Sequence, residues 1–175
     1  MSYAVRDEYI YKIRRVRVVC IGAGLTGIAA VHKLQTKHSD LEINFAIYEK
    51  NHDVGGTWLE NRYPGCACDV PAHSVRHLIT WLTNKYTYSW EGNPEWSRYY
   101  AGGREIWTYY KKLADDWRVD RVTRFNSRLL TATWDSKLCR YDLEIEDVKT
   151  GEKLKDYAEV LINATGWLKC FPASS

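Results

Sequence analysis

Apolar residues recur along the chain with different periods, and these periods predict the secondary structure. The continuous apolar run at 18–21 predicts a buried strand over 17–21, because a strand covered on both faces need not alternate. Apolar residues at helical spacing predict helices over 25–37 and 104–118. Alternation over 41–48 predicts a second strand. A strand, a helix and a strand in this order are typical of a parallel α/β unit.

The second half of the chain predicts further strands. Residues 129–134 and 141–146 have strand-like patterns on either side of a turn near Ser136. Residues 147–156 are polar and are expected to form a connection. The segment 157–163 is apolar and predicts a last strand.

The same patterns divide the chain into three parts. Residues 1–15 are mixed and polar, and we expect an N-terminal arm. One domain is predicted over 16–166, followed by a short tail at 167–175. Within the domain, residues 50–75 contain glycine and proline without strong periodicity, and loops this long are usually functional or disordered. The density of distinctive residues in this loop favours function.

Composition narrows the class of protein. The chain has 175 residues, enough for one domain with a core, and it is 45% hydrophobic and 27% charged, as expected of a globular protein. The net charge of +3 and the lack of a basic run interleaved with aromatic residues argue against nucleic-acid binding. No apolar stretch approaches the roughly 20 residues that span a bilayer. We therefore expect no membrane span and a cytoplasmic location.

Cysteine and histidine residues predict no metal site. The five cysteines are odd in number and irregular in spacing, so disulfides are not expected. Cys66 and Cys68 lack a second pair at metal-ligand spacing, which argues against zinc. Cys20 falls in the first strand and is expected to be a buried apolar residue. His32 and His38 are expected at the surface of the first helix or just after it.

A glycine-rich run, Gly-Ala-Gly-Leu-Thr-Gly at 22–27, follows the first strand directly. Gly22 would permit the tight turn, Gly24 would let a pyrophosphate approach the backbone, and Gly27 would let the helix pack closely. The phosphates would then face the N-terminus of the helix, where free N–H groups and the helix dipole favour negative charge. Taken alone, the run could also be an ordinary tight turn.

Glu49 closes the second predicted strand, the position at which a dinucleotide fold places its acidic residue. A carboxylate there can accept hydrogen bonds from ribose hydroxyls and would repel a 2′-phosphate. This favours FAD or NAD over NADP in the site. The alternative is a solvated surface acid.

Three more segments follow in a definite order: Gly-Gly-Thr-Trp at 55–58, Asn-Arg-Tyr-Pro-Gly at 61–65 with Asp69 after it, and Ala-Thr-Gly at 164–166. With these segments the sequence resembles the class B flavoprotein monooxygenases, and it is most similar to the Baeyer–Villiger monooxygenases of the fungal type. The resemblance extends from about Val16 to Gly166.

The resemblance implies an α/β, Rossmann-like FAD-binding fold of three layers with a β-meander, here an incomplete domain. It implies FAD and NADPH as cofactors of the family, whose members insert oxygen next to a ketone, here in fungal secondary metabolism. Asp69 would lie at the isoalloxazine as a catalytic residue, beside an arginine from later in the sequence. The residues that the resemblance assigns to FAD binding are Gly22, Gly24, Leu25, Thr26, Gly27, Glu49, Lys50, Gly56, Thr57, Trp58, Asn61, Asp69, Val70 and Tyr86.

The chain also departs from the family pattern. The 175 residues hold no second G-x-G-x-x-G for NADPH, no F-x-G-x-x-x-H-x-x-x-W fingerprint and no active-site arginine. Residues 75–85 interrupt a motif of the family and look like an insertion, either a translated intron or a loop extension. The tail at 167–175 does not continue into the linker usual in the family.

These departures predict a truncated FAD-binding part that is inactive alone and that a second chain could complete by supplying the missing domain. Two alternatives stay open: an FAD-binding scaffold or partner-dependent module, and a small flavoenzyme with NADPH-independent chemistry.

Overall fold

The structure, a computed structural model, describes residues 15–38, 42–72 and 86–166. The predicted insertion and tail lie outside these ranges, as does all of the predicted arm except Arg15. The elements in chain order are β1 (Val16–Ile21), α1 (Leu25–Lys37), β2 (Ile43–Tyr48), α2 (Thr57–Glu60), α3 (Gly103–Asp116), the 3-10 helix η1 (Val119–Val122), β3 (Thr123–Arg124), β4 (Ser127–Asp135), β5 (Arg140–Asp147), β6 (Lys153–Ala158) and β7 (Val160–Asn163).

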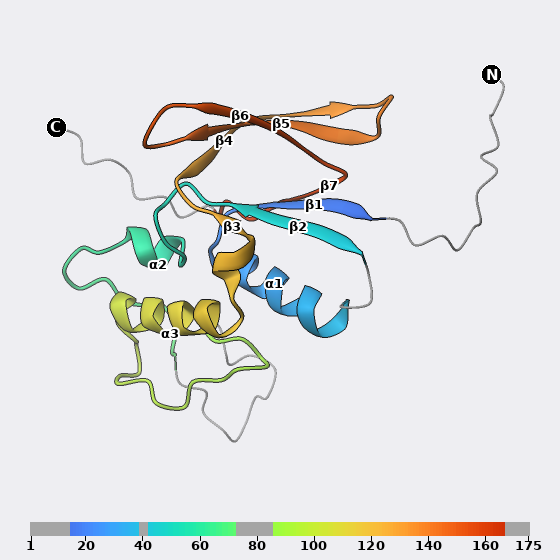
Figure 1. The fold of residues 1–175 in the computed structure, drawn as a ribbon. Helices are drawn as coiled ribbons and strands as arrows, with labels where there is room; N and C mark the ends of the chain where they lie inside the picture. Colours follow the sequence, from blue (N-terminus) through green and yellow to red (C-terminus); the bar gives the residue numbers. More distant parts are fainter. Residues whose placement is uncertain (1–14, 39–41, 73–85, 167–175) are drawn as a thin grey trace.

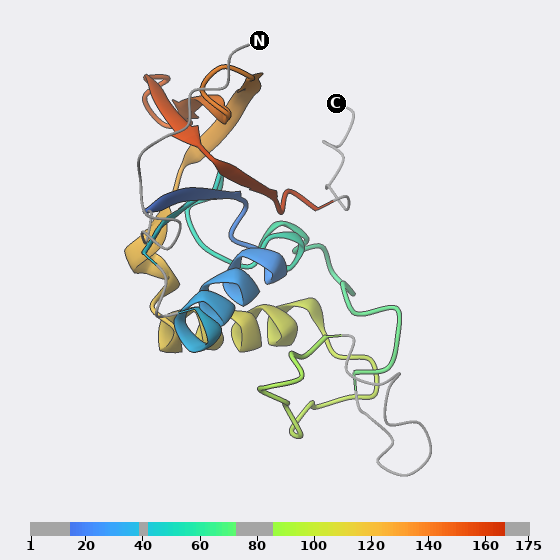
Figure 2. The same cartoon turned by 90° about the vertical axis from the view of Figure 1, so that its right-hand side faces the viewer.

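The elements form three layers around a parallel sheet with the strand order β3-β2-β1-β7. Helices α1 and α3 cover one face of this sheet, and the antiparallel meander β4-β5-β6 covers the other (Figures 1 and 2). The predicted three-layer α/β fold with a meander is confirmed. None of the helices in the described ranges is long and apolar enough to cross a membrane.

Strand β1 supplies both cores of the molecule, which explains its continuous apolar run. Cys20 faces the helices and is fully buried among residues of α1 and α3, including Tyr110. Val19 and Ile21 face the meander and pack in a second cluster with Ile145. The expectation that Cys20 is a small buried apolar residue is confirmed.

The last part of the chain was predicted wrongly. The expected polar connection over 147–156 is shorter than predicted, because β6 already begins at Lys153, and the expected single strand over 157–163 is divided at Glu159 between β6 and β7. The segment looked polar because β6 turns an acid inward. Asp156 Oδ2 accepts hydrogen bonds from Tyr48 Oη at 2.7 Å and from Arg17 Nη2 at 2.5 Å, and this network joins the meander to the parallel sheet.

Three short elements were also missed. The helix α2 lies within the predicted loop 50–75, and η1 and β3 follow α3. Each has four residues or fewer, too few for a hydrophobic period to show. The long helix α1, by contrast, has the predicted bounds.

His32 is not the surface residue that its polarity suggested, whereas His38 is exposed. The His32 ring is half-buried; it stacks on Trp90 with centroids 4.1 Å apart and meets Trp117 edge-on at 4.4 Å. Burial lowers the pKa of His32, and the nearby Lys33 and Lys37 lower it further. The side chain therefore fixes α1 to the aromatic segment after residue 86.

Candidate cofactor site

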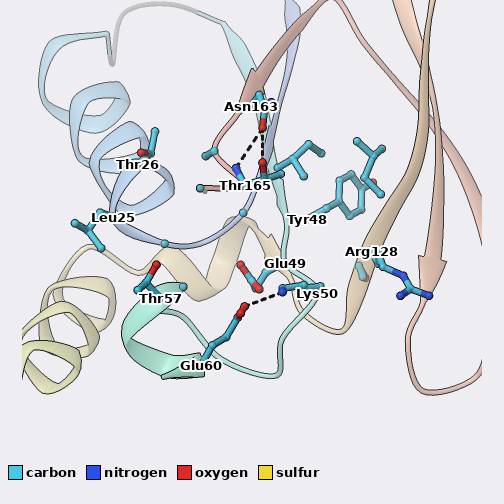
Figure 3. A pocket seen from close by; sticks show the side chains of 18 residues that line it. Leu25, Thr26, Tyr48, Glu49, Lys50, Thr57, Glu60, Arg128, Asn163 and Thr165 are labelled. Atoms are coloured by element: carbon cyan, nitrogen blue, oxygen red, sulfur yellow. Dashed lines mark hydrogen bonds and ion pairs between the residues drawn. The ribbon is translucent and has the colours of Figure 1, made fainter. Parts of the chain in front are cut away.

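A cavity of about 630 Å³ lies at the carboxyl ends of β1, β2 and β7, beside the start of β4 (Figure 3). This edge of a parallel sheet is where ligands bind in doubly wound folds. The cavity is lined by Ile21, Gly22, Gly24, Leu25, Thr26, Tyr48, Glu49, Lys50, Gly56, Thr57, Glu60, Ser127, Arg128, Leu129, Asn163, Ala164, Thr165 and Gly166.

The glycines of the first turn have different environments. Gly22 has φ +109°, and a Cβ there would lie 2.6 Å from the carbonyl oxygen of Ala164. A Cβ on Gly27 would lie 2.3 Å from the carbonyl oxygen of Gly22, so α1 packs closely on the turn. A Cβ on Gly24 would meet only Gly56, whose Cα would lie at the ordinary contact distance of 3.6 Å. Gly22 and Gly27 are thus required by packing, and Gly56 by its φ of +53°, whereas Gly24 has room for a Cβ. Gly24 and Gly56 both line the cavity without a side chain.

The N-terminus of α1 opens at the same place. Its N-cap is Gly24, which has no side chain to cap the helix, and its first turn carries no acidic residue. The first backbone N–H groups of a helix have no partner within the helix. Leu25 and Thr26, the first helical residues, line the cavity and can present these groups to an anion.

Glu49 is fixed beside this turn and is 4% exposed. Its Oε2 accepts a hydrogen bond from the Ala23 amide at 2.6 Å, and its Oε1 accepts one from the Asn51 amide at 2.9 Å. Each carboxylate oxygen keeps acceptor capacity for a second donor. The side chain is therefore oriented to accept hydrogen bonds from a ligand hydroxyl in the cavity.

A second group of predicted residues lies outside the cavity lining. Tyr86 Oη donates a hydrogen bond to Asp69 Oδ1 at 2.5 Å, and its ring meets Trp58 edge-on at 5.4 Å. Burial raises the pKa of Tyr86 to about 12, and the hydrogen bond to Asp69 contributes to the shift. The phenol therefore keeps its proton at neutral pH. The half-buried Val70 follows Asp69 directly.

Helix α2 connects the two groups. Its first residue, Thr57, lines the cavity, and the next residue, Trp58, contacts Tyr86. Asn61 caps the helix, because its Nδ2 donates to the Thr57 carbonyl at 2.9 Å. Asn61 thus stabilises the end of α2 and does not line the cavity.

Sequence reasoning missed several residues of the cavity wall. Ser127, Arg128 and Leu129 come from β4, and nothing in their local pattern points to a ligand. The segment 163–166 did carry a signal, because its Ala-Thr-Gly motif supported the family resemblance. In the structure Asn163 Oδ1 accepts hydrogen bonds from both the Thr165 amide and the Thr165 hydroxyl, which fixes this loop at the cavity (Figure 3).

Comparison with known proteins agrees with this geometry. Residues 20–102 match the family described as "NAD(P)-binding Rossmann-like domain". The chain is 40% identical over 155 residues to the FAD-binding monooxygenase tazF of Aspergillus terreus, covering 89% of this chain and 25% of that protein. It is 34% identical over 152 residues to a Baeyer–Villiger monooxygenase of Streptomyces coelicolor, covering 86% and 25%.

Solved structures of monooxygenases are also similar to this chain. An oxidised steroid monooxygenase bound to NADP superposes with a TM-score of 0.70 at 29% identity, covering 93% of this chain and 28% of that one. A cyclohexanone monooxygenase from Rhodococcus sp. Phi1, also bound to NADP, superposes with a TM-score of 0.71 at 27% identity, covering 92% and 28%.

The fold and the site define a Rossmann-like dinucleotide-binding unit. The relatives that it matches are named FAD-binding monooxygenases and Baeyer–Villiger monooxygenases, and the chain is similar to the N-terminal part of these proteins. It spans about a quarter of the length of the curated relatives that it matches.

Proposed function

We propose that this chain binds FAD, with the adenosine and pyrophosphate in the cavity and the flavin directed toward Trp58, Asp69 and Tyr86. The observation that carries the proposal is the cavity itself. It combines an oriented carboxylate, Glu49, with an uncapped helix N-terminus and two facing glycines.

The residues present fit each part of this cofactor. Glu49 can accept hydrogen bonds from the ribose hydroxyls. The N-terminus of α1 can stabilise the pyrophosphate, which can approach the backbone at Gly24 and Gly56, where no side chain enters the cavity. The remaining wall, which includes Leu129 from β4, can contact the adenine.

In the proposed reaction FAD, when bound, supplies the redox chemistry that activates oxygen, and the protein binds and orients it. Tyr86 holds one oxygen of Asp69 by donating a hydrogen bond, so that the Asp69 carboxylate keeps a fixed orientation. Trp58 packs against Tyr86 and supports it from α2. We propose that Asp69 then orients an arginine from outside these 175 residues.

The whole reaction in this proposal is the insertion of oxygen next to a ketone, driven by NADPH. The nicotinamide site and the arginine would come from outside these 175 residues, either in the same polypeptide or in a second chain. A cytoplasmic location is part of the same proposal.

Titration of the purified chain with FAD tests the proposal. We expect saturable binding, seen as a change in flavin fluorescence. Gly24→Ala should weaken it about tenfold to a hundredfold, the cost of losing one or more charge-assisted hydrogen bonds to the phosphates.

The matched control is Gly102→Ala, which adds the same methyl group in open space outside the cavity. This variant should bind FAD as the unaltered chain does. A folded chain that binds no FAD, or equal binding by the two alanine variants, would contradict the proposal.

A further inference from the structure

We propose that Glu60 determines the nucleotide specificity of this site. By pairing with Lys50, Glu60 keeps the ribose end of the cavity from accepting a 2′-phosphate. The inference rests on the proposed function, because it takes the adenosine ribose to lie at Glu49.

The charges at this end of the cavity come from three side chains that lie together in Figure 3. Lys50 follows Glu49 directly, and its Nζ lies 2.8 Å from Glu60 Oε1. The same Glu60 oxygen accepts a hydrogen bond from Asn51 Nδ2 at 2.8 Å. These two donors hold the Glu60 side chain in place on α2, and the side chain is only 20% exposed.

The balance of these charges decides which nucleotide is favoured. Glu49 repels a 2′-phosphate, but an unpaired lysine beside it would attract one, because the lysine ammonium is a common phosphate ligand. The charges of Glu49 and Lys50 alone would sum to zero. Glu60 restores a net negative charge at the ribose and occupies the ammonium that a phosphate would otherwise bind.

The other cation in the described cavity wall has the same arrangement. Arg128 Nη2 lies 2.5 Å from Glu146 Oε2, so its charge is also compensated by a carboxylate. Both cations that line the described cavity are therefore paired, and neither is left as a free phosphate ligand. The proposed reaction uses FAD together with NADPH, so rejection of a 2′-phosphate would keep the second nucleotide out of the FAD site.

Two competitors that differ only in the 2′-phosphate test this role. AMP and adenosine 2′,5′-bisphosphate are each titrated against chain-bound FAD at low ionic strength, and their inhibition constants are compared. In the unaltered chain AMP should compete better. In Glu60→Gln, which keeps an acceptor for Asn51 but removes the charge, the preference for AMP should fall about tenfold.

Lys50→Gln is the second variant. It leaves Glu60 without its ammonium partner, so the preference for AMP should rise instead of falling. The matched control is Asp53→Asn, which removes one negative charge, as Glu60→Gln does, but from the loop before α2. Asp53 pairs with Lys111 at 2.8 Å and does not line the cavity, so the preference should match that of the unaltered chain.

The outcomes distinguish failure of this inference from failure of the proposed function. If AMP competes with FAD but Glu60→Gln and Lys50→Gln leave the preference unchanged, the specificity role is wrong and the FAD site stands. If Asp53→Asn changes the preference as much as Glu60→Gln, the effect is general electrostatics and the role of Glu60 is wrong. If AMP does not compete with FAD at all, the location of the adenosine fails, and the inference fails with it.

Discussion

Gly24 and Gly27 belong to one turn, yet the absence of a side chain matters for different reasons at the two positions. At Gly27 the missing Cβ avoids a backbone oxygen only 2.3 Å away, which cannot move without displacing the turn. At Gly24 the nearest atom would be 3.6 Å away. We therefore expect Gly27 to be required for folding and Gly24 for the proposed binding of FAD.

Alanine substitutions should separate the two roles. Gly27→Ala should destabilise the chain by about 1–3 kcal/mol, the usual cost of overpacking, as measured by urea unfolding without FAD. Gly24→Ala should leave the unfolding midpoint nearly unchanged while weakening FAD binding. A stable Gly27→Ala variant, or a Gly24→Ala variant that unfolds as readily as Gly27→Ala, would show that this division is wrong.

At the scale of single residues, the sequence predicts those parts of the site that follow a known spacing along the chain. Gly22, Gly24 and Glu49 lie where a dinucleotide turn requires them, and all three line the cavity. Glu60 and Arg128 line it too, but they reach it through α2 and β4. Neither position is fixed by a local pattern, because both depend on how distant elements pack.

Among the elements, β6 connects the meander to the parallel sheet through a partly buried acid. Asp156 is 16% exposed at its side chain and accepts hydrogen bonds from Tyr48 and Arg17. Burial raises the pKa of Asp156, but these hydrogen bonds outweigh it, so the pKa lies below its usual value. The ionised form is therefore favoured in the folded protein.

Replacing Asp156 should make stability less dependent on acid pH. Because its folded pKa is depressed, Asp156 contributes stability above the unfolded value of about 3.9, and this is lost as the pH falls through the lower folded pKa. Asp156→Asn should be less stable than the unaltered chain by about 1.5–3 kcal/mol at pH 7. The difference should shrink below about pH 4, measured as urea midpoints over pH. A constant difference across that range would contradict the assignment.

The same strand shows why the sequence predicts some elements better than others. Helix α1 buries one apolar stripe, so its periodicity predicts its bounds correctly. Strand β6 turns Asp156 inward, and an inward acid breaks the alternation on which a strand prediction depends. Its partners Tyr48 and Arg17 belong to strands far away in the sequence, and only the folded chain brings them together.

At the scale of the molecule, the cavity depends on all three layers at once. The parallel sheet contributes the carboxyl ends of its strands, α1 contributes its N-terminus, and the meander contributes one wall through β4 (Figure 3). The similarity to the relatives covers most of this chain but only about a quarter of each relative's length. The central claim is therefore limited to what this part does: it holds the adenosine and pyrophosphate of FAD.

Competition of ADP and FMN with chain-bound FAD measures this claim most directly. ADP carries the adenosine and pyrophosphate without the flavin, and FMN carries the flavin without the adenosine. The account predicts that ADP displaces FAD at concentrations close to those of FAD itself, whereas FMN displaces it only weakly. Displacement by FMN but not by ADP would place the flavin, rather than the adenosine, in the cavity and would contradict the account.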